Sequence, residues 1–283
     1  MRASQDSRIR FDRELIIEAG HTERQYWRDL WNYRELFYFL AWRDILVRYK
    51  QTAIGIAWAL LRPFLTMLVL TIIFGKLAKF PSEGVPYPIL VFAAMLPWQF
   101  FANSLTECSN SLINNAGLIS KVYFPRLVIP TGSVIVSFVD FLLSGAILLG
   151  LMAWYNFWPT WRILALPFLI LLSFGAAMGA GLWTSAMNVK YRDFRYIVPF
   201  LVQFGLYISP VGFTSNVVPE KWRLLYSVNP MVGVIDGFRW AILNKDVVIY
   251  VPGFFLSMIL VMSLFLSGLW FFRKTERTFA DVI

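Results

Sequence analysis

The side chains that carry out most enzyme chemistry are scarce in this sequence. It contains one histidine, His21, and one cysteine, Cys108, which are too few for conventional zinc or triad chemistry, a multi-thiolate site or an internal disulfide. Paired carboxylates, a nucleophile beside a base and the phosphate loop Gly-x-x-x-x-Gly-Lys-Ser/Thr are not found either. We therefore interpret His21 and Cys108 as ordinary residues and expect no catalytic residue, metal or cofactor in this chain.

Two ionisable residues lie inside long apolar runs, where a charge is costly. Arg62 is expected to extend its side chain toward the lipid headgroups. Asp140 is expected to face the interior of a helix bundle and to pair with a hydroxyl group or with Arg62. A place in a conduction path is the alternative for Asp140.

The elements that must position these residues are membrane helices. Hydrophobic residues make up 58% of the chain and charged residues 15%, and the apolar residues occur in runs of roughly twenty, enough for an α-helix to cross the hydrocarbon core of a bilayer. We predict an all-α integral membrane protein with six transmembrane helices per protomer. The predicted spans are 56–77, 89–105, 127–154, 163–187, 197–213 and 247–272.

Two of these spans have special compositions. The far end of the second span, 104–115, turns polar and is predicted to project into water. The fourth span carries Gly175, Gly179 and Gly181, a small-residue face that would let a neighbouring backbone approach closely.

Two further segments are predicted to lie at the membrane without crossing it. Aromatic and basic residues alternate with aliphatic ones in 33–50, which is typical of a helix at the headgroup boundary. The segment 217–244 is interrupted by Pro219, Pro230, Gly233 and Gly237 and is predicted to form half-helices that dip into one leaflet, covered there by protein or facing a water-filled cavity.

The net charge of +9 does not indicate a nucleic-acid partner, because the basic residues flank the apolar runs and form no single stripe. They concentrate in the N-terminal segment, in 121–126, in 190–195 and in 273–277, which places both termini in the cytoplasm by the positive-inside rule. Residues 1–33 have no signal-peptide core and are expected to be retained. Basic residues on the opposite side weaken this bias; they are Lys76, Lys79, Lys221, Arg223 and Lys245.

The loop 114–126 contains more apolar side chains than a solvated loop needs. A short helix docked on a soluble partner would explain them. Packing against the neighbouring spans is the alternative.

Four stretches carry a resemblance to a known family. They are RYKQTAIGIAW (48–58), KVYFPR (121–126), NVKYRD (188–193) and NPMVGVIDGFRW (229–240). In this order they make the chain resemble, over about 33–272, the ABC-2 class of transporter permeases, with the closest similarity to exporters of O-antigen, capsular polysaccharide or teichoic acid.

The resemblance implies a division into a cytoplasmic N-terminal segment (1–32), an ABC-2 transmembrane domain (33–272) and a cytoplasmic tail (273–283). It implies a homodimer that works with two copies of an ATP-binding subunit, which binds ATP and Mg²⁺, and that exports a lipid-linked polysaccharide across the inner membrane of a bacterium. The residues around 226–243 would be re-entrant helices. The implied contacts with the ATPase are Leu118, Lys121, Val122, Tyr123, Phe124, Arg126, Tyr191, Arg192 and Asp193.

The segment 33–50 would be a gate helix whose cations guide a lipid headgroup; those residues are Arg34, Arg43, Arg48, Tyr49 and Lys50. A plain membrane anchor is the alternative for this helix. Sugar rings pack on aromatic rings, so nine aromatic residues are candidates for the channel lining, although interfacial belts are also aromatic. They are Trp58, Trp98, Phe100, Phe101, Tyr207, Phe213, Trp222, Tyr226 and Trp240.

Other functions remain open at this stage. Within the family, the substrate could be capsule, teichoic acid, a drug or a lipid. From other classes, an integral membrane glycan-transfer enzyme or a scaffold without transport would have to account for the short loops and the predicted half-helices.

Overall fold

A computed structural model describes residues 23–50, 55–82, 84–243, 247 and 249–279. His21, the first 22 residues and the last four residues lie outside this part of the chain. All regular elements in the described residues are helices, which confirms the predicted all-α fold. Their bounds are α1 Glu23–Asn32, α2 Arg34–Lys50, α3 Gly55–Leu70, η1 Thr71–Leu77, α4 Tyr87–Asn114, α5 Ala116–Ile119, α6 Val128–Trp154, η2 Trp161–Ala165, α7 Leu166–Lys190, α8 Phe194–Ile208, η3 Ser215–Val217, α9 Glu220–Tyr226, α10 Pro230–Ile242, α11 Val251–Thr275 and η4 Glu276–Thr278.

Within the described residues, five helices are long and apolar enough to cross a membrane: Ala57–Leu77, Tyr87–Asn114, Val128–Trp154, Trp161–Lys190 and Val251–Thr278. They match five of the predicted spans. The predicted span at 197–213 corresponds to α8, an apolar helix of 15 residues. It is shorter than expected because the chain leaves the helix at Ser209, just before Pro210.

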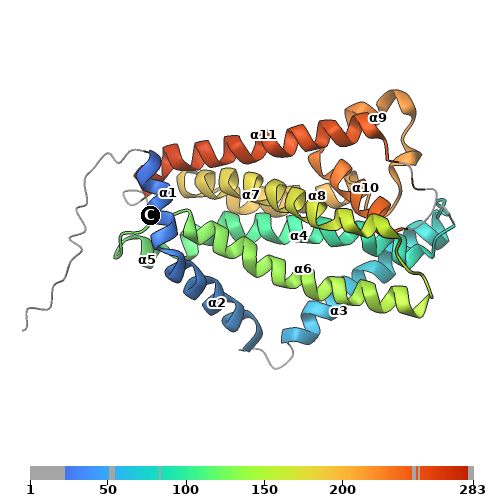
Figure 1. Cartoon of the computed structure of the whole chain (residues 1–283), viewed down its shortest axis with the longest axis horizontal. Helices are drawn as coiled ribbons and strands as arrows, with labels where there is room; N and C mark the ends of the chain where they lie inside the picture. The colour runs from blue at the N-terminus through green and yellow to red at the C-terminus, as the bar shows by residue number, and fades with distance from the viewer. Residues whose placement is uncertain (1–22, 51–54, 83, 244–246, 248, 280–283) are drawn as a thin grey trace, which may run out of the picture.

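The helices form an elongated bundle with two distinct ends (Figure 1). We call the end that holds α1, α5 and the C-terminus of α11 the α5 end, and the end that holds α9 and α10 the α9 end. Helix α4 lies at the centre, because it packs against α6, α7, α8 and α10. Helix α2 leans along α6, and α11 covers α7 and α10.

The second half of α4 corrects the expectation that 104–115 projects into water. The helix continues to Asn114, and Ser104, Cys108 and Ser111 are buried within the protomer. Small side chains allow this close packing, since a Cβ added at Gly181 of α7 would lie 2.7 Å from the Cys108 sulfur. The three buried side chains therefore face the inside of the protein, whereas Glu107 and Asn114 remain partly or fully exposed.

The predicted small-residue face of the fourth span lies where α7 meets α11. A Cβ added at Gly179 would lie 2.7 Å from the backbone carbon of Leu264 and 2.7 Å from the backbone nitrogen of Phe265. Real Cβ atoms do not approach backbone this closely, so the two helices can touch here only because residue 179 has no side chain.

Helices α9 and α10 form the predicted pair before the last span, but they differ in burial. Most of α10 is enclosed by α4, α7 and α11, whereas Trp222 and Leu225 of α9 are exposed. The buried Arg239 of α10 donates from Nη1 to the Phe213 carbonyl at 2.6 Å and from Nη2 to the Val211 carbonyl at 3.0 Å. Its Nε also donates to the Leu90 carbonyl of α4 at 3.3 Å, so one cation ties α10 to α4 and to the loop after α8.

Replacing Gly179 with alanine is expected to loosen the contact between α7 and α11. The added methyl group would overlap backbone that cannot rotate away, and overpacking of this kind costs about 1–3 kcal/mol. The control is Gly150→Ala on α6, where an added Cβ meets nothing within 4 Å and helix propensity favours alanine. Thermal unfolding in detergent should show a lower midpoint for the first variant and an equal or higher midpoint for the second; equal midpoints would contradict this packing.

Replacing Arg239 with methionine is expected to lower stability by about 2 kcal/mol or more, because charge-assisted hydrogen bonds to three carbonyls are lost from a buried site. The matched control is Arg223→Met on α9, whose half-buried guanidinium donates to the carbonyls of Val218 and Asn216. Thermal unfolding and limited proteolysis of the loop after α8 would measure both variants. A larger loss for Arg223→Met than for Arg239→Met would contradict the role assigned to Arg239.

Candidate functional site

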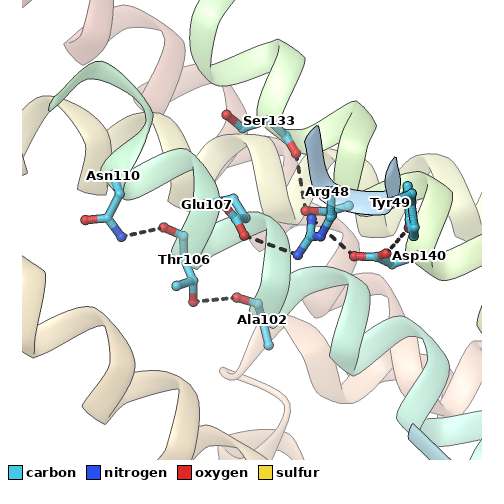
Figure 2. A network of polar contacts seen from close by, with 9 residues as sticks. Arg48, Tyr49, Ala102, Thr106, Glu107, Asn110, Ser133 and Asp140 are labelled. Atoms are coloured by element: carbon cyan, nitrogen blue, oxygen red, sulfur yellow. Dashed lines mark hydrogen bonds and ion pairs between the residues drawn. The ribbon is translucent and has the colours of Figure 1, made fainter. Parts of the chain in front are cut away.

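The C-terminal end of α2 reaches the middle of α6 through a polar network (Figure 2). Arg48 forms ion pairs with Asp140 of α6, at 3.3 Å from Nη1 to Oδ2, and with Glu107 of α4, at 3.2 Å from Nη2 to Oε1. The Tyr49 hydroxyl donates to Asp140. Asp140 lies twelve residues after Val128, the first residue of α6, or about 18 Å along that helix. The C-terminal end of α2 therefore lies beside the middle of the bundle and not at the α5 end.

The sequence predicted a hydroxyl group as one possible partner for Asp140 without naming it, and Tyr49 supplies that hydroxyl group. Burial raises the pKa of the Tyr49 phenol, and the hydrogen bond to Asp140 raises it further, so Tyr49 remains a protonated donor. Arg62, the other expected partner, lies exposed on α3, and Arg48 takes the place of the cation. The sequence did not indicate the Arg48 pair, because α2 and α6 are far apart in the chain.

Two cavities lie on either side of this network. The first, which we call the α5-side cavity, has a volume of about 320 Å³ and lies between α2, α4 and α6; its lining includes Arg43, Asp44, Arg48, Glu107, Asn114 and Ser133. The second, the central cleft, has a volume of about 360 Å³ and lies between α3 and α8 over α4 and α6; its lining includes Arg48, Trp58, Arg62, Trp98, Asn103 and Asp140. Arg48 lines both.

A row of polar side chains on α4 connects the two cavities. Gln99 and Asn103 line the central cleft, whereas Glu107, Ser111 and Asn114 line the α5-side cavity. The spacing of three or four residues puts these side chains on one face of the helix. This row is the part of the site that sequence reasoning missed, although its periodicity was visible once 104–115 is treated as helix.

The residues proposed for the gate helix have separate surroundings. The Arg43 guanidinium pairs with Asp44 at 2.7 Å and donates to the Asn115 side chain at 3.0 Å. Arg34 lies near the start of α2 with its guanidinium 5.7 Å from the Trp31 ring, and Lys50 is exposed at the other end. Only Arg43, Arg48 and Tyr49 of the five reach a cavity wall.

The turn that follows α5 presents apolar side chains to the outside. Tyr123 is 55% exposed and Val122 is 48% exposed, and Lys121 is exposed beside them. Phe124 points inward and is 4% exposed, and Leu118 is half-buried. Each of the two alternatives for this loop therefore holds for some of its side chains. Phe124 and Leu118 pack against the bundle, whereas Val122 and Tyr123 are exposed and could contact a partner.

The same turn is tied to the end of α11. The Arg126 guanidinium donates to the Glu276 backbone carbonyl, and the Tyr26 hydroxyl of α1 donates to the Glu276 carboxylate at 3.0 Å. The Arg273 guanidinium lies 4.6 Å from the centre of the Tyr26 ring. Burial raises the pKa of Tyr26, and so does the Glu276 carboxylate, so this phenol also stays a donor.

The second cytoplasmic contact implied by the family lies between α7 and α8. Tyr191, Arg192 and Asp193 are all exposed there, with the Lys190 ammonium 5.3 Å from the Tyr191 ring. This segment and the turn after α5 share the α5 end of the bundle, because α7 and α4 both end there. Their role in contacting an ATPase stays a prediction.

The nine aromatic residues predicted to line a channel fall in different places. Trp58 and Trp98 line the central cleft, and Phe101 packs against Trp98. Phe100 is 2% exposed and packs against Phe138 and Phe141 in the protomer core. Tyr207 is exposed near the end of α8.

The other four lie at the α9 end. Phe213 packs with Phe74 and Phe80, and Trp222 is exposed on α9. The Tyr226 hydroxyl donates to the Ile208 carbonyl at 2.7 Å, and the Trp240 ring lies 5.2 Å from the Arg162 guanidinium. Contact with a substrate stays a prediction for all nine.

Comparison with known proteins gives consistent matches. O-antigen export system permease protein RfbA of Myxococcus xanthus is 30% identical over 215 residues, which cover 75% of this chain and 82% of the relative. The protein of the same name from Klebsiella pneumoniae is 26% identical over 248 residues, covering 85% and 92%. Polysialic acid transport protein KpsM of Escherichia coli is 25% identical over 245 residues, covering 83% and 91%.

The family model described as ABC-2 type transporter matches residues 35–243. This range includes all of α2 except Arg34, the polar network, both cavities, the turn after α5 and the α9–α10 pair. Since the match spans well over half of the 283 residues, the chain belongs to the ABC-2 type transporter family of membrane proteins.

Proposed function

We propose that this chain is the membrane-spanning subunit of an exporter that moves a lipid-linked polysaccharide across the inner membrane of a bacterium. O-antigen is the first candidate for this polysaccharide. The observation that carries the proposal is the similarity to two O-antigen export permeases over most of their length, with 82% and 92% of those relatives covered. Capsular polysaccharide is the second candidate, because a polysialic acid transport protein is similar over 91% of its length.

The central cleft supports a path for a sugar chain. It combines two indole rings, Trp58 and Trp98, with amide side chains and with the cations of Arg48 and Arg62. Flat aromatic faces and amides offer weak, repeated contacts, which suit a long polar chain better than one tight site. The cleft is open on one side of the protomer, and a second copy of the chain would close it into a channel.

The α5 end faces the cytoplasm in this proposal, and two copies of a separate ATP-binding subunit dock there. The exposed turn after α5 and the exposed segment 191–193 supply the surface for that contact. ATP and Mg²⁺ are bound by the partner subunit, in accord with the lack of a phosphate loop in this sequence. This chain therefore transmits motion and hydrolyses nothing itself.

The proposal is tested by purifying the chain from its native membrane in a mild detergent and analysing the bound proteins and lipids by mass spectrometry. Recovery of an ATP-binding cassette subunit together with a polyprenyl-linked glycan is the expected result. A chain that purifies alone, with no glycolipid, would contradict it.

Replacing Tyr123 with alanine is expected to weaken binding of the ATPase subunit about tenfold or more, because truncating a central aromatic side chain commonly costs about 2 kcal/mol at an interface. The matched control is Trp161→Ala, since Trp161 is 74% exposed but lies toward the α9 end. Co-purification of the ATPase and stimulated ATP hydrolysis would be measured for both. Equal retention of the ATPase by the two variants would contradict docking at the turn.

A further inference from the structure

Glu276, in the short helix η4 that follows α11, contacts two other segments at the α5 end. Its carboxylate accepts a hydrogen bond from the Tyr26 hydroxyl of α1 at 3.0 Å, and its backbone carbonyl accepts one from the guanidinium of Arg126, in the turn after α5. One residue therefore joins α1 to that turn through two different groups. We call Tyr26, Arg126, Arg273 and Glu276 the Glu276 junction.

Arg273 fixes the Tyr26 side chain by a second contact. Its guanidinium lies 4.6 Å from the centre of the Tyr26 ring and 5.7 Å from the centre of the Trp27 ring, distances at which a cation is attracted to an aromatic face. The phenol is thus held at its hydroxyl by Glu276 and at its ring by Arg273.

The two sides of the junction rest on buried side chains. Phe279, which follows η4, is 2% exposed, and its ring packs edge-to-face on Phe272 of α11 with 5.4 Å between the ring centres. In the turn, Phe124 is 4% exposed and Leu127 is 5% exposed. The end of α11 and the inner side of the turn are therefore each fixed to the bundle, and the junction fixes them to each other.

The turn has little secondary structure of its own. Helix α5 is four residues long, which is too short to be stable by itself. The backbone hydrogen bonds that continue it end with the Val122 amide, which donates to the Leu118 carbonyl at 3.1 Å, and the next one along the described chain lies at the start of α6. The conformation of 123–127 therefore depends on side-chain contacts, such as those of Phe124 and Arg126.

The junction combines parts of the chain from inside and outside the family match. The match covers 35–243, which includes Arg126 and the turn but neither Tyr26 of α1 nor Glu276 of η4. The turn is thus common to the family model, whereas the residues that hold it lie before and after the matched range. The junction is a feature of this chain that the family match does not supply.

We propose that Tyr26, Arg273 and Glu276 are positioning residues for the contact with the ATPase subunit. They hold Arg126, and through it the turn, in the conformation in which Tyr123 is exposed to a partner. This inference rests on the proposed function, because it concerns the turn at which the ATPase docks there.

Hydrogen exchange in the full chain alone, in nanodiscs and without the ATPase, tests the hold on the turn. The amides of Lys121 and Val122 report on it, because both donate to the Leu118 carbonyl. Tyr26→Phe removes only a hydroxyl and is expected to speed their exchange several-fold, since loss of a local contact favours local opening. Arg126→Gln removes the contact of the turn itself and should speed it further.

Tyr38→Phe is the matched control for this measurement. Tyr38 of α2 is 67% exposed and its ring stacks on Trp42, so loss of its hydroxyl should leave the amides of the turn unchanged. Equal exchange in Tyr26→Phe and Tyr38→Phe would overturn the proposal. Tyr26→Phe keeps the test decisive if Arg126→Gln fails to fold.

The affinity for the ATPase subunit separates positioning from a general loss of stability. Tyr26→Phe should weaken ATPase binding about threefold to tenfold, the effect of one hydrogen bond. The midpoint of thermal unfolding should stay near that of the parent chain, because the ring can still face Arg273. A lower midpoint with unchanged affinity of the folded chain would show a merely structural role and would rule out positioning.

A double substitution tests whether the two residues act as one unit. Glu276→Gln keeps the backbone carbonyl that accepts from Arg126 and weakens only the contact with Tyr26. Combined with Tyr26→Phe, it should weaken ATPase binding no more than the larger of the two single changes, because both act on the same hydrogen bond. Additive losses would contradict the junction.

Tyr123→Ala distinguishes failure of this inference from failure of the proposed docking. If Tyr123→Ala weakens ATPase binding and Tyr26→Phe does not, the positioning role is wrong and docking at the turn stands. If neither substitution weakens binding, docking at the turn is wrong, and the positioning role fails with it.

Discussion

Polar groups that a chain carries into hydrocarbon must find their partners within the protein, and this constraint explains the arrangement of the bundle. Arg239 meets it with three backbone carbonyls, Asp140 meets it with Arg48 and the Tyr49 hydroxyl, and the side-chain nitrogen of Asn188 of α7 meets it by donating to the Ser109 carbonyl at 2.9 Å. Each of these residues joins segments that are distant in the sequence. The apolar surface is left to the lipid, where large aliphatic and aromatic side chains stay exposed on α3, α8 and α11.

Helix α4 is tightly packed along its first half and presents polar side chains along its second half. Its first half is enclosed on all sides, with seven consecutive residues from Ile89 to Met95 at 0% exposure. Its second half is enclosed against α7 by small side chains but presents the polar row to the cavities. A helix that is packed tightly on one side and polar on the other can line both cavities with a fixed wall.

Much of the fold could be predicted from the length of the apolar runs, because a run of roughly twenty apolar residues is typical of an α-helix that crosses a bilayer. The glycine face of α7 was also predictable, since small residues at helical spacing indicate close contact. The extent of α4 was not, because its polar end was interpreted without knowing that α2, α6 and α7 surround it. The Arg48–Asp140 pair could not be predicted either, since nothing in a single sequence states that residues 92 positions apart are neighbours.

Helix α11 is one of the long helices that run between the α5 end and the α9 end. At its C-terminus, α11 is held to the turn after α5 by the contact between Arg126 and the Glu276 carbonyl. Near its N-terminus, the Ser257 hydroxyl accepts from the Gly233 amide of α10 at 3.2 Å and donates to the Ser227 carbonyl, just after α9, at 3.3 Å. A helix resists compression along its axis, so a displacement at the turn would reach the α9–α10 pair through α11. The central cleft is lined from α2, α3, α4, α6 and α8, whereas α11 packs against α7 and α10, so a displacement carried along α11 would pass outside the walls of the cleft.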